Sequence, residues 1–440
     1  MSAATAASQR RRQANQYLLK HQLRADQVSI PPADDLHTVV VMPAYDEPHL
    51  EDTLHAFQQL EAPTRGVELL VVINESETET TALQDQHARQ AKHLNAHFAG
   101  ARFPIHVVHH HALPQRHAGV GLARKLGMDE ALSRLCQRNN PNGLIVGLDA
   151  DCRCDANYLC ALEAHFERFA KMSASTIYFE HPLRPDVDPQ AVSGMIRYEL
   201  FLRYHVRGLR FAKSPAAFHT LGSCLAVRGL DYARQGGMNR RQGGEDFYFL
   251  QKYFRLQAVG ECLTTRVEPS ARVSARAPFG TGAAQHRWSV APDPDFPVYD
   301  PRGYDVLREV FQIVRDLEFD RAHDGLDALV ATRLGRYLRS ANFPDAFRGL
   351  LDNVATTEQL RQKVLGWFDG FRALKALHWL TDQHWPKVPI AVGVEWLMHR
   401  RGVSVSRDVE AQLAALRTLD RTGDGSPARE VGFLSARGAD

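Results

Sequence analysis

Apolar segments of strand length alternate with helix-patterned segments between residue 38 and about residue 270. Parallel strands need crossover connections, which are usually helices, so this alternation predicts a largely parallel sheet covered by helices. The fold class that we expect is therefore α/β, with a doubly wound domain. The expected strands are Val39–Met42, Glu68–Ile73, Ile105–His109 and the run that ends at Asp149, and the expected helices are residues 47–60, the segment that ends at Leu94 and a helix from about Val120.

The character of the sequence changes after Trp288, where four prolines between residues 292 and 301 mark a loop. Helical spacing then dominates, as in the stripe formed by Val306, Val310, Ile313 and Leu317. We expect residues 1–35 to form an N-terminal tail with a short helix around Gln13–Leu23, residues 36–290 to form the α/β domain, residues 300–420 to form a helical C-terminal region, and residues 421–440 to form a mobile tail.

The composition is that of an ordinary globular protein, with 44% apolar and 24% charged residues. A net charge of +2 argues neither for nor against an anionic partner, and we expect no nucleic-acid partner. The longest apolar runs are strand-sized, so no transmembrane segment is expected. Six cysteines without a signal peptide favour a reducing cytoplasm, and a peripheral position at the inner face of a membrane stays open.

The apolar run from Gly143 to Leu148 ends in the sequence Asp149-Ala150-Asp151. Side chains two residues apart in an extended segment point to the same side, so both carboxylates can converge on one hard cation that also binds diphosphate oxygens. Acidic residues also end strands simply because they stay solvated there. Taken alone, the motif leaves both interpretations open.

Polar residues follow the first two expected strands, at the edge where ligands bind in open α/β sheets. The first strand leads into Pro43-Ala44-Tyr45-Asp46-Glu47. The second leads into Asn74 and Glu75, whose amide and carboxylate could bond a base or a ribose. The alternative is that both segments are solvated turns with helix-capping groups.

A glycine-containing helix start at residues 117–121 is followed one turn later by Arg124 and Lys125. The free N–H groups at such a helix start and the guanidinium of Arg124 would suit a diphosphate. The segment lacks the Gly-Lys-Ser/Thr ending of a Walker loop, and it also lacks the spacing of a GxGxxG motif.

Taken in this order, the segments resemble the nucleotide-sugar-dependent glycosyltransferases of GT-A fold, in particular the inverting family 2 type, over roughly residues 38–290. Residues 43–47 resemble the family's Pro-Ala-Tyr-Asn-Glu motif, with Asp46 in place of the usual asparagine. The DxD motif is matched by Asp149 and Asp151. Two later segments are also similar: Gly222 lies in the glycine loop that borders the donor sugar, and Glu245 and Asp246 match the xED motif.

The resemblance implies a Rossmann-like, doubly wound GT-A domain and a role for each motif. Asp151 would hold Mn²⁺ or Mg²⁺, and Asp149 would contact the ribose or the metal. Asp246 would act as general base on the acceptor hydroxyl, with its charged form favoured by the helix dipole, and Glu245 would be a hydrogen-bonding group. His286 would ligate the metal or touch the diphosphate, unless it is a structural or surface histidine. The donor-binding residues would be Pro43, Ala44, Tyr45, Glu47, Asn74, Glu75, Arg124, Asp149 and Gly222.

The resulting hypothesis is a metal-dependent, inverting glycosyltransferase that moves one sugar from a nucleoside-diphosphate sugar, with UDP favoured, to an acceptor hydroxyl. The acceptor would be a glycan, a lipid or a small molecule, bound by residues 177–214 and the helical region. Arg272 and Arg276 could clamp a phosphate or could be solvated. The alternatives are a retaining GT-A transferase of the glucosyl-phosphoglycerate synthase type and a non-catalytic GT-A-shaped binding protein. The sequence leaves the oligomeric state open and is compatible with a homo-oligomer.

Overall fold

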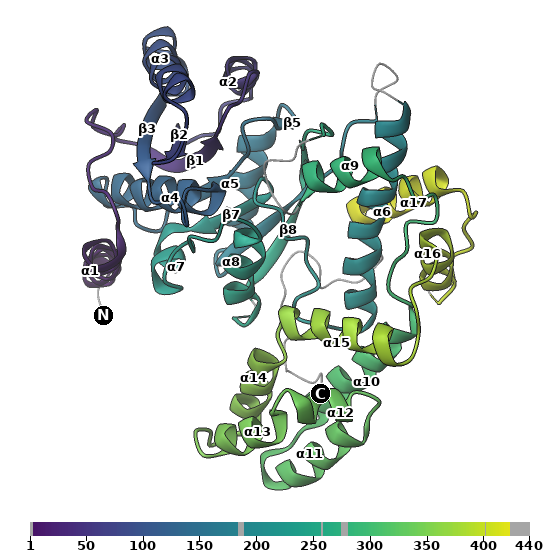
Figure 1. Cartoon of the computed structure of the whole chain (residues 1–440). Helices are drawn as coiled ribbons and strands as arrows, with labels where there is room; N and C mark the ends of the chain where they lie inside the picture. Colours follow the sequence, from purple (N-terminus) through teal and green to yellow (C-terminus); the bar gives the residue numbers. More distant parts are fainter. Residues whose placement is uncertain (1–2, 184–188, 257, 274–279, 401, 423–440) are drawn as a thin grey trace.

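The computed structural model describes residues 3–183, 189–256, 258–273, 280–400 and 402–422 (Figure 1). Its strands form one eight-stranded sheet in the order β3-β2-β1-β4-β7-β6-β8-β5. Strands β7 and β5 run antiparallel to their neighbours, and all other neighbouring strands in this sheet are parallel. The predicted α/β class with a mostly parallel sheet is therefore confirmed. The strands are β1 Leu36–Ala44, β2 Gly66–Ser76, β3 Ile105–Leu113, β4 Leu144–Gly147, β5 Arg153–Cys154, β6 Ala174–Phe179, β7 Leu225–Arg228 and β8 Val259–Glu268.

Helices connect these strands and continue beyond the sheet in the C-terminal part of the chain (Figure 1). The helices in and around the sheet are α1 Ala3–His21, α2 Leu50–Gln58, α3 Thr81–His97, α4 Val120–Gln137, α5 Tyr158–Arg168, α6 Pro189–Phe211, α7 Gly229–Arg234, α8 Glu245–Phe254 and α9 Thr281–Val290. The later helices are α10 Arg302–Asp316, the 3₁₀ helix η1 Phe319–Arg321, α11 Ala322–Ala331, α12 Gly335–Ser340, α13 Phe343–Leu351, α14 Thr357–Trp367, α15 Gly370–Gln383, α16 Ile390–His399 and α17 Val409–Thr422.

The central strands are buried on both faces, which explains why their sequences are continuously apolar. Alternate residues of β1 contribute to different cores: Val40 and Met42 belong to one, and Val39 and Val41 belong to the other. Helices α2, α3 and α5 contribute side chains to the first core, whereas α1, α4, α7 and α8 contribute to the second. The sheet is therefore the middle layer between two sets of helices.

Helix α1 packs onto α4 on the second face of the sheet. The Tyr17 hydroxyl donates a hydrogen bond to Asp129 at 2.8 Å, and Lys125 Nζ donates to the same carboxylate at 2.8 Å. Helix α1 begins at Ala3 and is therefore longer than the short helix predicted around Gln13–Leu23. Its docking against α4 was not visible in the sequence because it depends on these polar contacts.

The helical region that the sequence predicted is present as α10 to α17, but its apolar core is shared with α6. Leu200 and Tyr204 of α6 pack in the same cluster as Tyr304 and Val310 of α10 and Leu377 of α15. The boundary expected near residue 290 therefore does not separate two independent cores. Among the residues described, no helix has both the length and the apolar character needed to cross a membrane.

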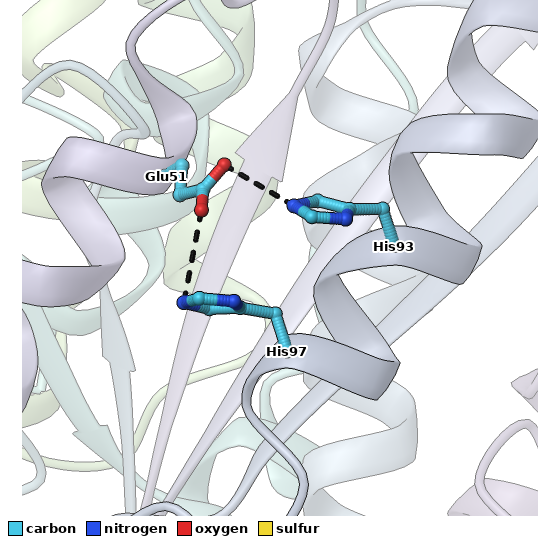
Figure 2. A group of neighbouring side chains, drawn as sticks. All are labelled: Glu51, His93 and His97. Carbon is cyan, nitrogen blue, oxygen red and sulfur yellow. Dashed lines mark ion pairs between the residues drawn. The ribbon is translucent and has the colours of Figure 1, made fainter.

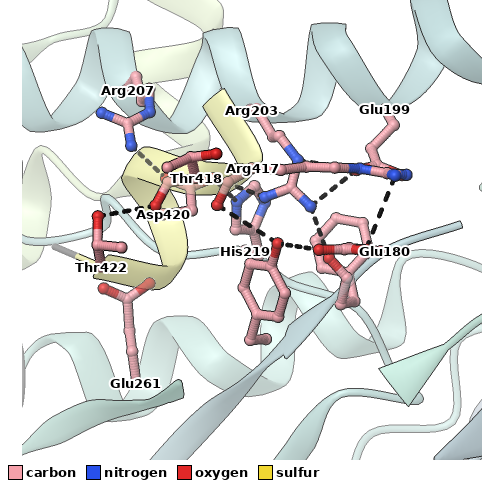
Figure 3. A network of polar contacts seen from close by, with 12 residues as sticks. Glu180, Glu199, Arg203, Arg207, His219, Glu261, Arg417, Thr418, Asp420 and Thr422 are labelled. Atoms are coloured by element: carbon pink, nitrogen blue, oxygen red, sulfur yellow. Dashed lines mark hydrogen bonds and ion pairs between the residues drawn. The ribbon is translucent and has the colours of Figure 1, made fainter. Parts of the chain in front are cut away.

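A buried network of charged side chains joins α17 to α6 (Figure 3). Asp420 lies 2.7 Å from Arg203, 2.7 Å from Arg207 and 3.2 Å from Arg210. Burial alone would raise the pKa of Asp420, but His219, whose Nε2 lies 3.9 Å from the carboxylate, and the guanidinium charges hold this pKa well below its ordinary value. The network thus attaches the last described helix to the helix that both parts of the molecule share.

We predict that Asp420→Ala destabilises the protein by about 3–5 kcal/mol, because it leaves buried guanidinium groups without their carboxylate. Chemical denaturation followed by circular dichroism measures this loss. Asp382→Ala removes an exposed carboxylate from α15 and should change the stability by less than about 0.5 kcal/mol. Equal denaturation midpoints for the two variants would show that the network contributes no net stability.

Candidate active site

A cavity of about 560 Å³ lies at the edge of the sheet where β4 and β8 end. Its walls come from the turn after β4, the segment before β7, the segment after β8, the start of α8 and one side of α6. Residues chosen from separate sequence motifs line this one cavity, namely Asp149, Asp151, Gly222, Glu245 and Asp246. The structure therefore brings the two predicted carboxylate motifs together.

Arg124, near the start of α4, connects these two motifs. The side chain is only 3% exposed. Its Nη2 pairs with Asp149 Oδ1, and its Nη1 pairs with Glu245 Oε1. A buried guanidinium needs such compensation of its charge, so the pairing ties the turn after β4 to the start of α8. Both terminal nitrogens of Arg124 are engaged by carboxylates, so these contacts do not favour the direct diphosphate contact expected from the sequence.

Two glycines make room for the Arg124 bridge. A Cβ atom at Gly222 would fall on the Arg124 guanidinium. At Gly121, a Cβ atom would meet the carbonyl oxygen of Arg241 and would lie 3.1 Å from the Cβ of Glu245. Gly222, which was expected to border the donor sugar, therefore also has a steric role in the position of the guanidinium.

Asp149 and Asp151 lie in a turn and not in an extended segment. Strand β4 ends at Gly147, and the N–H of Cys152 donates to the carbonyl of Asp149 at 3.1 Å. The extended-chain argument for their convergence is therefore wrong. Both carboxylates nevertheless line the cavity, with 35% and 28% of their side chains exposed.

The residues of this turn fit a hard divalent cation. Carboxylate oxygens are the ligands that Mg²⁺ and Mn²⁺ prefer. Burial, and then the negative charge of Asp149, raises the pKa of Asp151, which Arg272 opposes. The guanidinium of Arg272 already pairs with Asp151, with its Nη2 3.1 Å from Asp151 Oδ2. Asp149 and Asp151 thus form a partly exposed pair that a further cation would stabilise.

Arg272 also binds Glu47 and so links two distant loops. Its Nη1 donates to Glu47 Oε1 at 2.7 Å, which joins the loop after β1 to the segment after β8. No local pattern in the sequence marks this contact, because residues 47 and 272 meet only in the folded chain. Arg276, the other arginine considered for a phosphate, lies outside the described residues.

Asp246 occupies the first turn of α8, which starts at Glu245 after Gly244 in a left-handed conformation (φ 67°). Burial, and then the charge of Glu245, raises the pKa of Asp246 to about 7, while the positive charge of Arg124 opposes the shift. The helix dipole was expected to favour the charged form of Asp246, but burial and the charge of Glu245 favour the neutral form. A carboxyl group with a pKa near neutrality is suited to proton transfer.

Part of the cavity wall is apolar. Tyr198 and Phe201 come from α6, Phe218 comes from the segment before β7, and Leu374 comes from α15. Two of these elements, α6 and α15, lie in the regions that the sequence analysis expected to bind the acceptor. The cavity can therefore accommodate a ligand that has both a polar and an apolar face.

Among the described residues that line the cavity, Glu75 is absent. It is 1% exposed, and its carboxylate contacts His87 Nδ1 and, at 3.0 Å, His109 Nε2. His87 Nε2 in turn accepts a hydrogen bond from the N–H of Asp46 at 3.1 Å. The expected contact of Glu75 with a base or a ribose is thus not supported: Glu75 positions the loop after β1 through His87, which no sequence motif had marked.

The other residues expected on the donor side lie near the ends of β1 and β2, outside the residues that line the cavity. The Tyr45 side chain is exposed and its hydroxyl donates to Glu79 at 2.6 Å. Asn74 is buried and its amide donates to the carbonyl of Gly119 at 3.3 Å. Pro43 and Ala44 are the last residues of β1.

His286 does not line the cavity among the described residues. It lies on the exposed side of α9, whereas Ala284, Gln285 and Trp288 form the buried side. The periodicity of the helix directs His286 away from the buried side of α9. His286 is therefore exposed and lies outside the cavity lining, which does not favour its expected role as a metal ligand.

We predict that Gly222→Ala destabilises the protein by about 1–3 kcal/mol, because the added methyl group forces the Arg124 guanidinium out of its position. Thermal denaturation monitored by circular dichroism measures the effect. Gly349→Ala is the matched control: it adds a methyl group to an exposed position of α13 with no atom within 4 Å, and should stabilise the helix by up to about 1 kcal/mol. A Gly222→Ala variant as stable as the control would contradict the steric role.

Comparison with known proteins identifies a family for the N-terminal part of the chain. Residues 39–223 match the model of glycosyl transferase family 2. No curated protein matches the sequence.

Solved structures with a similar arrangement include TarS of S. aureus (residues 1–349) in complex with UDP-GlcNAc. The two chains are 14% identical, and the alignment covers 88% of this chain and 92% of that TarS chain with a TM-score of 0.37. The mannosyltransferase PcManGT from Pyrobaculum calidifontis, in complex with GDP-Man and Mn²⁺, is 16% identical over 96% of both chains with a TM-score of 0.34. Similarities at this level support no conclusion about activity.

The family match is therefore the basis of the assignment. It includes the Asp149-Ala150-Asp151 turn and Gly222 and ends before Glu245 and Asp246. Over residues 39–223 this chain matches glycosyl transferase family 2, and the protein is a glycosyltransferase.

Proposed function

We propose that this glycosyltransferase is metal-dependent and inverting, and that it moves one sugar from a nucleoside-diphosphate sugar to an acceptor hydroxyl. The observation that carries the proposal is the shared cavity, which is lined by the Asp149 and Asp151 pair and by Asp246. UDP is the favoured nucleotide because the resemblance to family 2 favours it. The apolar part of the cavity wall supports a glycan or lipid acceptor, since both offer apolar surface beside hydroxyl groups.

Asp149 and Asp151 would hold Mn²⁺ or Mg²⁺, which would stabilise the negative charge of the leaving diphosphate. Both carboxylates are partly exposed to the cavity, as such a role requires. Arg124 keeps Asp149 in position and compensates its charge. Glu245 is bound by the same guanidinium, which favours a positioning role for Glu245 over a hydrogen bond to the acceptor or the donor.

Asp246 is the proposed general base. As the acceptor oxygen attacks the anomeric carbon, Asp246 takes the hydroxyl proton, and the bond between the anomeric carbon and the diphosphate oxygen breaks. Attack on the side opposite the leaving group inverts the anomeric centre. A retaining transferase would give a product of the other configuration, so NMR of the product anomer distinguishes the two mechanisms.

The experiment that tests this function measures UDP release from UDP-sugars by the full chain in the presence of Mn²⁺. The wild type should turn over at least one UDP-sugar, and Asp246→Asn should lower kcat by about 100-fold or more while donor binding is retained. Asp382→Asn, which changes an exposed carboxylate to an amide at the surface of α15, should leave kcat unchanged. Wild-type turnover in Asp246→Asn would exclude Asp246 as the base, and a wild type that binds UDP-sugars without turnover would contradict the proposed transfer reaction.

The raised pKa of Asp246 predicts a pH dependence of kcat/KM. The base must be ionised to accept a proton, so kcat/KM should rise about tenfold per pH unit up to the pKa of about 7 and level off above it. Steady-state rates between pH 5 and pH 9 measure this profile. A constant kcat/KM across the range below pH 7 would contradict the assignment.

A further inference from the structure

A second cluster of ligand-type side chains lies between α2 and α3 (Figure 2), and none of its members lines the cavity. His93 and His97 are one turn apart on α3 and therefore share one face of this helix. His93 Nε2 is 3.4 Å from Glu51 Oε2, and His97 Nε2 is 3.7 Å from Glu51 Oε1. His55, one turn after Glu51 on α2, has its Nε2 3.9 Å from the same Oε1.

These separations are those of ligands around one ion. In a tetrahedral zinc site with bonds of about 2.0–2.1 Å, neighbouring ligand atoms lie about 3.3 Å apart. The ligand atoms of Glu51, His93 and His97 all lie within 4.8 Å of one another. The three ligand atoms would have to move closer to one another by side-chain rotation to reach this geometry.

We propose that Glu51, His93 and His97 bind a divalent transition-metal ion of the zinc class. Imidazole nitrogens favour Zn²⁺, Ni²⁺ and Cu²⁺, whereas carboxylate oxygens alone favour Mg²⁺ and Mn²⁺. This site is therefore chemically distinct from the Asp149 and Asp151 pair. It does not depend on the proposed function.

The site is accessible to an ion from solution. The side chains of Glu51, His55, His93 and His97 are between 41% and 59% exposed. The other cluster with suitable ligand atoms, Glu75, His87 and His109, differs in this respect. His87 is fully buried, and its two ring nitrogens already contact Glu75 and the N–H of Asp46.

The location of the site gives a bound ion a structural consequence. Helix α2 follows the loop after β1, and α3 follows the end of β2. An ion shared by Glu51 and the two histidines of α3 would fix these helices to each other. Because the ion binds only the folded arrangement, it should raise the thermal stability of the protein.

The test is a calorimetric titration of the full-length protein with Zn²⁺ alone, comparing the wild type with the double variant His93→Ala/His97→Ala. The wild type should bind one equivalent of Zn²⁺. The double variant should bind Zn²⁺ with an affinity lower by about 100-fold or more, because loss of even an outer-shell partner of a metal ligand lowers metal affinity by about 10–100-fold. Zn²⁺ should raise the melting temperature of the wild type and not that of the variant.

The matched control is His323→Ala/His399→Ala, which removes two exposed histidines from other helices and should retain the wild-type equivalent. Glu51→Gln removes the charge of the third ligand with little change in shape and should also weaken binding, so the result does not depend on one variant. Circular dichroism without Zn²⁺ verifies that each variant is folded. A wild type that takes up no Zn²⁺, or a double variant that binds it as the wild type does, would overturn the proposal.

Discussion

The buried guanidinium of Arg124 is the contact on which the arrangement of the cavity depends. It joins Asp149, which follows β4, to Glu245, which opens α8, and these residues are far apart in the sequence. A buried charge of this kind is tolerated only because two carboxylates compensate it. Asp246 comes directly after Glu245, so the same contact places the proposed base at the cavity. Gly222 is required beside the guanidinium for steric reasons.

Helix α6 connects this cavity to the C-terminal region. Tyr198 and Phe201 lie on its cavity side, whereas Arg203 and Arg207 lie on another side and bind Asp420 of α17. Residues three or four apart on a helix share a face, so Tyr198 and Phe201 lie together on one side of α6 and Arg203 and Arg207 lie together on another. The helical region is therefore part of the structure that shapes the candidate acceptor side, and it is not an independent appendage.

Much of this architecture could be predicted from the sequence, because the burial of each strand is encoded in its own residues. Motif order also predicted that Asp149, Asp151 and Asp246 meet. The ion pairs of Arg272 could not be predicted, since they arise between loops that approach only after folding. His286 is exposed because of which side of α9 faces the core, and the residues around His286 do not indicate that side. The pKa of Asp246 depends in the same way on burial that no local pattern encodes.

The most direct test of the central claim is a crystal structure of the protein with UDP and Mn²⁺, with the ion located by its anomalous scattering. The account predicts an anomalous peak beside the carboxylates of Asp149 and Asp151, with the diphosphate in the same cavity as Asp246. A peak confined to Glu51, His93 and His97, or UDP bound at a surface away from Arg124, would contradict it.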